Sequence, residues 1–435
     1  MMNDHKLKLK EKIKKFFKIL GPGLITGAAD DDPSGIATYS QTGAQFSYGL
    51  LWTALFMLPL QTAVQEACAR LGAVTGKGVA AVIKEHYSKK ILFLVVSLVL
   101  VSNIINIGAD IGAMAAAAKL IIPVNFALLA IFFTATILIL EIFTSYQAYS
   151  KILKILALSL LAYPLTVFIV KEPWIQILKA TFIPHFELSF QFLFIITAVL
   201  GTTISPYMFF WQASEENEEE KKLHLLRKTN QPKITSNFMH SLRIDNFLGM
   251  LFSEIGTWAI IVVAATVLNS HGIINIGSAA DAAKALEPLV QSFPNSGYLA
   301  KLIFSAGIIG LGLLSVPILA GSAAYAFAET FNWKEGLNQK LKKAWGFYGV
   351  IILSTLVGLL INFVGINPIS ALVYTAVING VVAVPLVFVI WLMTKNEKVM
   401  GKYKNGWLSN LLILTTFIGM GIAALAMFVM LINRF

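Results

Sequence analysis

The chain has 435 residues, of which 57% are hydrophobic and only 13% are charged, against roughly 25% charged residues in soluble domains. This composition excludes an ordinary soluble protein and indicates a polytopic membrane protein. A single cysteine, Cys68, excludes a disulfide framework and a thiolate cluster. The net charge of +11 comes from basic residues between apolar segments, so it does not indicate nucleic-acid binding.

Hydropathy predicts eleven membrane spans, two of them interrupted by polar residues. In chain order they run over 19–45, 49–73, 91–119, 123–144, 150–170, 189–217, 245–269, 300–328, 346–363, 369–394 and 408–432. We therefore expect an all-α polytopic fold, with residues 1–18 as a basic tail and 19–435 as one transmembrane domain. The tail is rich in lysine and has no small-residue cleavage site after a short apolar core, which excludes a cleaved signal peptide.

Lysines and arginines alternate between the predicted loops. The N-terminal tail and every second loop carry 27 of the 34, the opposite loops carry six, and Arg70 lies within the second span. Cytoplasmic loops of membrane proteins are enriched in basic residues. The pattern predicts a cell-membrane protein with a cytoplasmic N-terminus and an extracellular C-terminus.

The first span is interrupted by Asp30, Asp31 and Asp32, followed by Pro33. One unpaired charge at mid-bilayer costs at least ~2.5–3.5 kcal/mol, and proline removes a backbone donor, so we expect the helix to break here beside a cavity. Asp32, directly before the break, could bind a cation or cap the next helix. Asp30 and Asp31 cannot share its face in a regular helix, and we assign them to the ion pathway, with vestibule or salt-bridge partners as the alternative.

The sixth span is interrupted about halfway along the chain, at Thr202, Thr203, Ser205, Pro206 and Tyr207. Pro206 should leave the carbonyl of Thr202 without its helical donor. That carbonyl and the Ser205 hydroxyl are candidate cation ligands, although serine also bonds back to its own helix. Two broken spans in corresponding positions of two halves indicate a transporter substrate site.

Isolated polar residues lie inside other predicted spans, with Asp110 in the third, Glu254 in the seventh and Asn379 in the tenth. Such residues are either functional or helix–helix contacts, and we interpret Asn103 and Asn106 as contacts. All six histidines fall in the tail or loops, which leaves no mid-membrane imidazole for proton relay or a soft metal site. The chain has no Walker-type phosphate loop and hence no ATP-binding motif.

Several motifs together resemble the NRAMP divalent-metal transporters. They are Gly21-Pro-Gly-Leu24, Asp32-Pro33, Thr42-Gly-Ala-Gln-Phe46 through Tyr48-Gly-Leu-Leu-Trp52, and Ala69-Arg-Leu-Gly72 with Val74-Thr-Gly-Lys77. The resemblance implies a LeuT-type inverted repeat of five plus five spans with broken helices 1 and 6 and an eleventh span. The repeats would cover about 19–170 and 189–394, and the extra span about 408–432. Family members bind a divalent cation between the two broken helices.

The departures from the family pattern fall on its metal and proton positions. Gly35 stands for an asparagine, Ser205 for a methionine, Tyr207 and Gln212 for two histidines, Ala113 for a third-span acid and Ala376 for a tenth-span glutamine, with Asn379 one turn on. This pattern resembles the divergent NRAMP-related branch whose members include magnesium transporters.

We therefore predict a secondary transporter that imports Mg²⁺ and Mn²⁺ as partly hydrated ions, because carboxylate, carbonyl, hydroxyl and water suit hard cations whereas thioethers suit softer ones. The predicted metal ligands are Asp32, Gly35, Thr202, Ser205 and Asn379, and the predicted pathway residues are Asp30, Asp31, Thr203, Tyr207, Asp110, Gln212 and Glu254. Proton coupling should be weak or absent, because tyrosine and glutamine do not relay protons by titration at neutral pH.

Several alternatives stay open on the sequence. The chain could be a proton-coupled Mn²⁺/Fe²⁺ importer that uses Met208 or other groups, a LeuT-type carrier of an organic solute, or an intramembrane aspartyl protease with Asp32 and Asp110 as its dyad. The main interpretation expects a non-enzyme with no resident cofactor, whose partners are divalent ions and the lipid bilayer and not nucleic acid.

Overall fold

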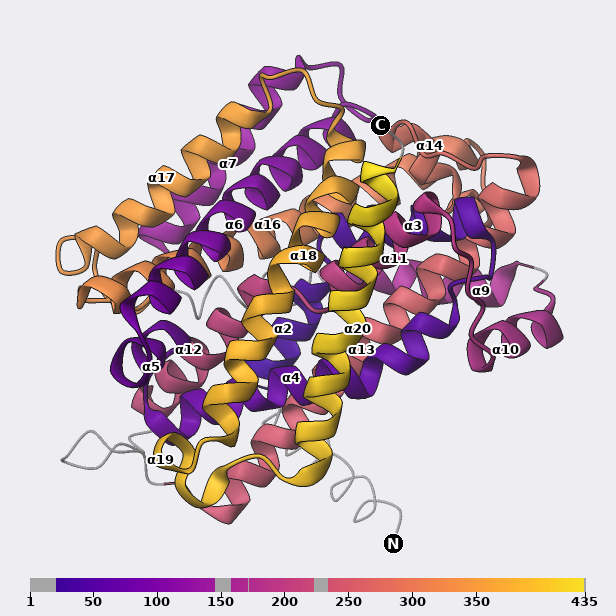
Figure 1. Ribbon diagram of the computed structural model, residues 1–435. Coiled ribbons are helices and arrows are strands. Elements are labelled where there is room, and N and C mark those ends of the chain that lie inside the picture. Colours follow the sequence, from indigo (N-terminus) through magenta and orange to yellow (C-terminus); the bar gives the residue numbers. More distant parts are fainter. Residues whose placement is uncertain (1–20, 145–157, 171, 223–233, 434–435) are drawn as a thin grey trace, which may run out of the picture.

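The computed structural model describes residues 21–144, 158–170, 172–222 and 234–433, and every regular element in these ranges is a helix (Figure 1). The predicted tail over 1–18 lies outside the described residues. The expected all-helical architecture is confirmed for the part of the chain that the structure describes.

The first half contains two short helices where one span was predicted. Its elements are α2 (Pro22–Asp30), α3 (Pro33–Phe46), α4 (Trp52–Thr75), α5 (Val79–His86), α6 (Lys89–Ala118), α7 (Phe126–Phe143), the 3₁₀ turn η1 (Leu158–Leu161) and α9 (Ala162–Ile169). The fifth predicted span, 150–170, is described only from residue 158, where η1 and α9 fall inside it. Helix α5 connects α4 to α6 and was not predicted.

The second half repeats this plan, again with a break in its first long segment. Its elements are α10 (Trp174–Phe182), α11 (Phe190–Thr203), α12 (Pro206–Lys222), α13 (Ser236–Val263), η2 (Ala264–Leu268), η3 (Asn269–His271), α14 (Ala279–Lys284), α15 (Glu287–Val290), α16 (Ser296–Phe331), α17 (Trp345–Ile361), α18 (Pro368–Lys395), α19 (Glu397–Met400), η4 (Gly401–Tyr403) and α20 (Trp407–Ile432). The short helices α10, α14 and α15 lie in connections that hydropathy alone does not resolve.

Among the described residues, seven helical segments are long and apolar enough to cross a membrane alone. They are Lys89–Ala118, Phe126–Phe143, Phe190–Glu219, Ser236–His271, Ser296–Phe331, Pro368–Lys395 and Trp407–Ile432. Four predicted spans are not among these seven. The first is divided between α2 and α3, α4 carries Gln61, Gln65, Glu66 and Arg70 among its 24 residues, the fifth is described only from residue 158, and α17 is only 17 residues long. Helix α16 has 36 residues, about 54 Å at 1.5 Å per residue, which is longer than a hydrocarbon core of about 30 Å.

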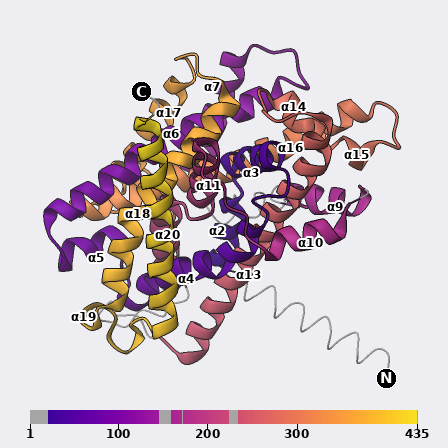
Figure 2. The same cartoon turned by 45° about the vertical axis from the view of Figure 1, so that its right-hand side comes forward.

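The two breaks lie in the interior of the bundle, where Figures 1 and 2 both place α2, α3 and α11 among the longer helices. Helix α2 packs on α13, α11 packs on α18, and α6 packs on α16, α17 and α18. Glycines permit the closest approaches: a Cβ added at Gly27 would lie 2.2 Å from the Gly249 carbonyl oxygen, and one added at Gly201 would lie 2.1 Å from that of Ala376. These contacts hold the ends of the broken helices in fixed positions.

Candidate ion site between two broken helices

The first break occupies two residues. Helix α2 ends at Asp30, Asp31 has φ −85° and ψ 46°, and Asp32 is extended at φ −61° and ψ 175° before α3 begins at Pro33. Proline suits the first helical position, where its missing N–H has no intrahelical partner in any case. The predicted break before Pro33 is confirmed.

Asp32 caps α3 with one carboxylate oxygen. Its Oδ1 accepts hydrogen bonds from the Gly35 N–H at 2.8 Å and the Ser34 hydroxyl at 2.6 Å. Its Oδ2 accepts one bond, from Asn106 Nδ2 of α6 at 3.3 Å. The cap leaves Oδ2 as the carboxylate atom with spare acceptor capacity for a cation.

The second break separates α11 from α12. Helix α11 ends at Thr203 and α12 begins at Pro206, as predicted. The Ser205 hydroxyl donates to the carbonyl oxygens of Gly201 at 2.7 Å and Thr202 at 2.9 Å. The expectation that the Thr202 carbonyl lacks a donor is therefore wrong, because Ser205 replaces the donor that Pro206 removes, although the carbonyl keeps a second lone pair.

Hydroxyl groups connect the two breaks directly. The Tyr207 hydroxyl donates to the Ala29 carbonyl oxygen at 2.8 Å, and the hydroxyls of Tyr39 and Thr203 share a hydrogen bond at 2.9 Å. The Ser34 and Thr202 hydroxyl oxygens lie 3.5 Å apart. The predicted residues of both breaks thus meet at one place, although they are separated by more than 160 positions in the sequence.

The three aspartates point in different directions, as the helix geometry required. Asp30 Oδ2 accepts from Gln61 Nε2 of α4 and from the Ser253 hydroxyl of α13, both at 2.5 Å. Asp31 lies against Gly256 of α13, where an added Cβ would lie 2.9 Å from its Oδ2, and neither of its oxygens has a hydrogen-bond partner. Within the described residues neither aspartate has an ion pair.

The predicted pathway residues on other helices have separate contacts. Asp110, one turn after Asn106 on α6, accepts from the Ser315 hydroxyl of α16 at 2.6 Å. Gln212 accepts from the Thr26 hydroxyl at 2.5 Å, so it connects α12 to α2. Glu254 of α13 is buried with both carboxylate oxygens unpartnered.

Asn379 and Gly35 are the predicted ligands with the weakest connection to the ion position. Asn379 is buried on α18 with its Nδ2 unpartnered, and no hydrogen bond within the described part of the chain joins it to either break. Gly35 offers no side chain, and an added Cβ would lie 3.2 Å from the Asp30 carbonyl oxygen and 3.3 Å from Thr202 Oγ1. An amide ligand at position 35 would therefore need its neighbours to shift.

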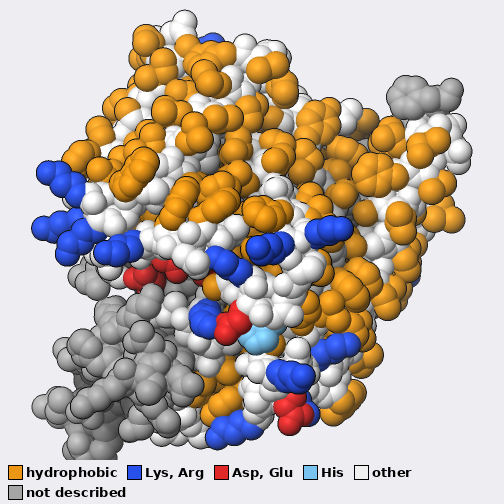
Figure 3. All heavy atoms as spheres, turned by 60° about the vertical axis from the view of Figure 1, so that its left-hand side comes forward, with side chains coloured by type: hydrophobic (Ala, Val, Ile, Leu, Met, Phe, Trp, Pro, Cys, Tyr) orange, Lys and Arg blue, Asp and Glu red, His pale blue; other side chains and the backbone are white. Residues whose placement is uncertain are grey.

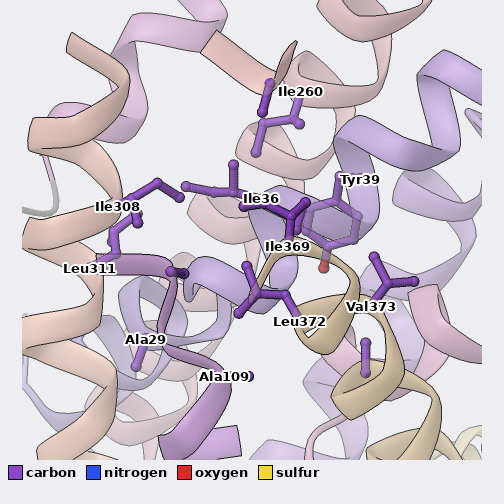
Figure 4. Close-up of a cluster of buried hydrophobic side chains, with 14 of the residues drawn as sticks. Ala29, Ile36, Tyr39, Ala109, Ile260, Ile308, Leu311, Ile369, Leu372 and Val373 are labelled. Atoms are coloured by element: carbon purple, nitrogen blue, oxygen red, sulfur yellow. The ribbon is translucent and has the colours of Figure 1, made fainter. Parts of the chain in front are cut away.

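The site is closed to solvent. Asp30 and Asp31 are 0% exposed and Asp32 is 1% exposed. Figure 4 shows Ile36, one turn beyond Asp32, between Ile308 and Leu311 of α16 on one side and Leu372 of α18 on the other. These apolar side chains pack around α3 one turn beyond Asp32.

The chemistry around Asp32 is that of oxygen donors. In the part of the chain that the structure describes, no three His, Cys, Asp or Glu side chains are grouped so that they could hold a metal ion together. The groups around Asp32 are instead neutral: the Ser34 hydroxyl donates to Oδ1, the Asn106 amide nitrogen donates to Oδ2, and the Thr202 hydroxyl oxygen lies 3.5 Å from that of Ser34. Such a set offers one charge and leaves coordination positions for water, which is how Mg²⁺ is usually bound.

Sequence reasoning missed several of these neighbours. Asn106 was interpreted as a helix–helix contact, whereas its amide contacts Asp32; Asn103 does fit that interpretation, because it donates to the Leu319 carbonyl and the Ser322 hydroxyl of α16. The position of Asn106 one turn before Asp110 could have indicated its role. Gln61 and Ser253 are polar residues within apolar helices, and only their partners reveal that they bind Asp30.

Comparison with known proteins identifies the family. A family model described as natural resistance-associated macrophage protein-like (Nramp) matches residues 23–430. The chain belongs to the NRAMP family. The divalent metal cation transporter MntH of Caldanaerobacter subterraneus subsp. tengcongensis is 26% identical over 398 residues, covering 90% of this chain and 88% of that protein. The NRAMP chain is thus a divalent metal cation transporter and not an enzyme, which excludes the aspartyl protease alternative.

Solved structures agree on the fold. A manganese transporter of Eremococcus coleocola superposes with a TM-score of 0.73 at 15% identity, covering 95% of this chain and 87% of that one. Mhp1, a nucleobase-cation-symport-1 family transporter, superposes with a TM-score of 0.59 at 13% identity, covering 94% and 91%. The NRAMP chain therefore has the LeuT-type fold that the sequence predicted.

Proposed function

We propose that this NRAMP protein imports the hard divalent cations Mg²⁺ and Mn²⁺, bound as partly hydrated ions at Asp32. The observation that carries the proposal is the position of Asp32 Oδ2, a carboxylate oxygen free of the helix cap between two broken helices. The nearby hydroxyls of Ser34 and Thr202 supply neutral oxygens, which favour hard ions. This ligand set supports membership of the NRAMP-related branch that includes magnesium transporters.

The remaining predicted ligands act around that oxygen in this proposal. The Thr202 carbonyl has one lone pair left, and the Ser205 hydroxyl oxygen can accept an ion while its proton stays on the backbone. Gly35 contributes through its backbone, since its N–H donates to Oδ1 of Asp32, and Asn379 would contribute its buried amide from α18. Asp30, Asp31 and Glu254 are buried carboxyl groups, and each of them that ionises adds negative potential, which attracts a cation toward the site. Thr203 and Tyr207 hold the second break against the first through Tyr39 and Ala29, and they release these partners during alternating access.

We propose further that proton coupling is weak or absent. Tyr207 and Gln212 are engaged in hydrogen bonds with Ala29 and Thr26, and neither titrates near neutral pH. Ala113 offers no carboxylate. The membrane potential is sufficient as a driving force, since two charges that cross 100 mV gain about 4.6 kcal/mol.

A proton-coupled Mn²⁺/Fe²⁺ importer is the second candidate, and the comparisons favour it. The MntH relatives are named divalent metal cation transporters, and the Eremococcus coleocola structure is that of a manganese transporter. A Mn²⁺/Fe²⁺ importer would need a softer ligand such as a thioether, and none is evident at the breaks, because Met208 is part of the buried apolar core. Both candidate functions include Mn²⁺ transport, so Mg²⁺ transport and proton coupling are the properties that distinguish them.

The experiment is metal uptake into proteoliposomes at clamped membrane potential, with Mn²⁺ and Mg²⁺ tested in turn and internal pH recorded. Our proposal expects uptake of both ions without internal acidification. Acidification that scales with metal flux and disappears in Asp32→Asn would support the second candidate. We also propose that the protein lies in the cell membrane with its N-terminus in the cytoplasm. The test introduces Lys6→Cys or Ser270→Cys in a Cys68→Ala background and labels the new cysteine from each side of the membrane.

A further inference from the structure

A cavity opens on the outer surface of the bundle, and none of the residues of the two breaks belongs to its lining. It has a volume of about 630 Å³, within the range of roughly 300–1,000 Å³ typical of ligand pockets. Its wall comes from α6, the end of α16, the connection to α17 and the first turns of α17, including Leu100, Ile104, Phe327 and Val350. Most of this wall is apolar.

The cavity faces the surroundings of the protein and not its core. Trp345 and Leu353, both in its lining, are 77% and 64% exposed. Leu356 and Leu360 continue the exposed apolar surface along α17. A surface of this kind in a membrane-embedded helix contacts acyl chains.

Glycines give the cavity its depth. The indole ring of Trp333 packs against Gly346, where an added Cβ would lie only 2.7 Å from the ring. One turn further along α17, a Cβ added at Gly349 would meet no atom within 4 Å. A side chain at position 349 would therefore project into the cavity without displacing the wall.

The rim of the cavity is basic. Lys334 and Lys343 belong to its lining, and both are exposed. The connection 332–344 carries four lysines, Lys334, Lys340, Lys342 and Lys343, against one acidic residue, Glu335. No ion pair among the described residues involves Lys334 or Lys343. The two lysines thus offer positive charge at the entrance of an apolar cavity.

The surface view places this charge at a membrane boundary. Figure 3 shows the face that carries α17, where lysine and arginine side chains form a band along the edge of a broad apolar surface. Trp333 and Trp345 lie beside the lysines in the sequence, and tryptophan is enriched at the level of lipid headgroups. Basic pockets between membrane helices at this level are suited to anionic headgroups.

We propose that this cavity binds one anionic phospholipid. Its phosphate lies between Lys334 and Lys343, and one acyl chain lies along α17 over Gly346 and Gly349. The charge selects an anionic lipid over a zwitterionic one, and the cavity shape determines whether any lipid is retained. This inference is independent of the transported ion and its coupling.

The test is native mass spectrometry of the purified full chain, titrated with dioleoyl-phosphatidylglycerol or dioleoyl-phosphatidylcholine. For the parent we expect a first bound lipid with a several-fold preference for phosphatidylglycerol. Lys334→Gln/Lys343→Gln should remove the preference and keep residual binding of both lipids. Gly349→Leu should lower binding of both lipids, because leucine fills the cavity.

The matched control is Lys398→Gln/Lys402→Gln, which removes two lysines of the α18–α20 connection outside the cavity lining. It should keep the parental preference. The proposal would be overturned if the parent and Lys334→Gln/Lys343→Gln showed the same preference for phosphatidylglycerol. It would also be overturned if the control lost as much of this preference as Lys334→Gln/Lys343→Gln does. Should Gly349→Leu fail to fold, the lysine variant alone decides, since its exposed side chains do not support the core.

Discussion

Asn106 of α6 donates a hydrogen bond from its Nδ2 to Oδ2 of Asp32, over a distance of 3.3 Å. Oδ2 is the oxygen that the helix cap leaves free, and the opposite amide atom, Asn106 Oδ1, is buried without a partner. The amide nitrogen, and not this oxygen, faces Asp32 Oδ2, so Asn106 Oδ1 would reach a cation at Oδ2 only after the amide turns. Helix α6 therefore lines the site together with the two broken helices.

Replacing Asn106 by alanine should weaken ion binding. The substitution removes the side chain that positions Oδ2 of Asp32 and the amide oxygen that could turn toward an ion, so we expect the KM for Mn²⁺ to rise several-fold. The control is Asn103→Ala, whose amide contacts only α16 and whose loss should lower stability without changing KM. Equal KM values for both variants would remove Asn106 from the site.

Ser205→Met should shift selectivity toward softer ions. A thioether favours transition metals over Mg²⁺, so Cd²⁺ should compete more effectively with Mn²⁺ uptake than it does in the parent. Ser205→Ala is the control, because it removes the hydroxyl that bonds to Gly201 and Thr202 and adds no sulfur. An unchanged Cd²⁺ to Mg²⁺ preference in the competition assay would place position 205 away from the ion.

Asp31→Asn should have two opposite effects. Its carboxylate is fully buried without a hydrogen-bond partner, and an unpaired buried charge is costly, so the variant should unfold at a higher temperature in chelator. The lost negative potential should raise the KM for Mn²⁺ several-fold, though less than a change at Asp32. A lower unfolding temperature together with an unchanged KM would show that Asp31 is structural.

Gly201→Ala should destabilise the fold. The new methyl group would lie 2.1 Å from the Ala376 carbonyl oxygen, and overpacking of this kind costs about 1–3 kcal/mol. Gly419→Ala on α20 is the matched control, because its Cβ would meet nothing within 4 Å and alanine favours a helix. Thermal unfolding in detergent measures both, and a Gly201→Ala midpoint at or above that of Gly419→Ala contradicts the packing argument.

The sequence was sufficient for the architecture and for the positions of the two helix breaks. Long apolar runs predict membrane helices, and an aspartate before a proline inside such a run leaves few alternatives to a break. The positions of α2, α3, α11 and α12 follow from those local signals. Asn106 could not be distinguished from Asn103 in this way, because both are asparagines on one apolar helix and only the packing of α6 decides which one faces Asp32.

The contacts of Ser205 show the same limit. A proline predicts that a carbonyl loses its donor, but whether a neighbouring hydroxyl replaces that donor depends on a rotamer that no pattern reveals. The direction of Asp31 is likewise set by the approach of Gly256 on α13. Contacts between residues far apart in the sequence decide these details, and such contacts cannot be predicted from the local pattern of apolar and polar residues.

The most direct test of the account is Mg²⁺-competed Mn²⁺ uptake into proteoliposomes containing either the parent or Asp32→Asn. Asparagine keeps the shape and the cap of α3 while removing the charge that offsets ion dehydration. We predict saturable Mn²⁺ uptake that Mg²⁺ inhibits in the parent, and uptake at the level of empty liposomes in a folded Asp32→Asn. Parental rates of Mn²⁺ uptake in that variant would contradict the assignment of the ion to Asp32.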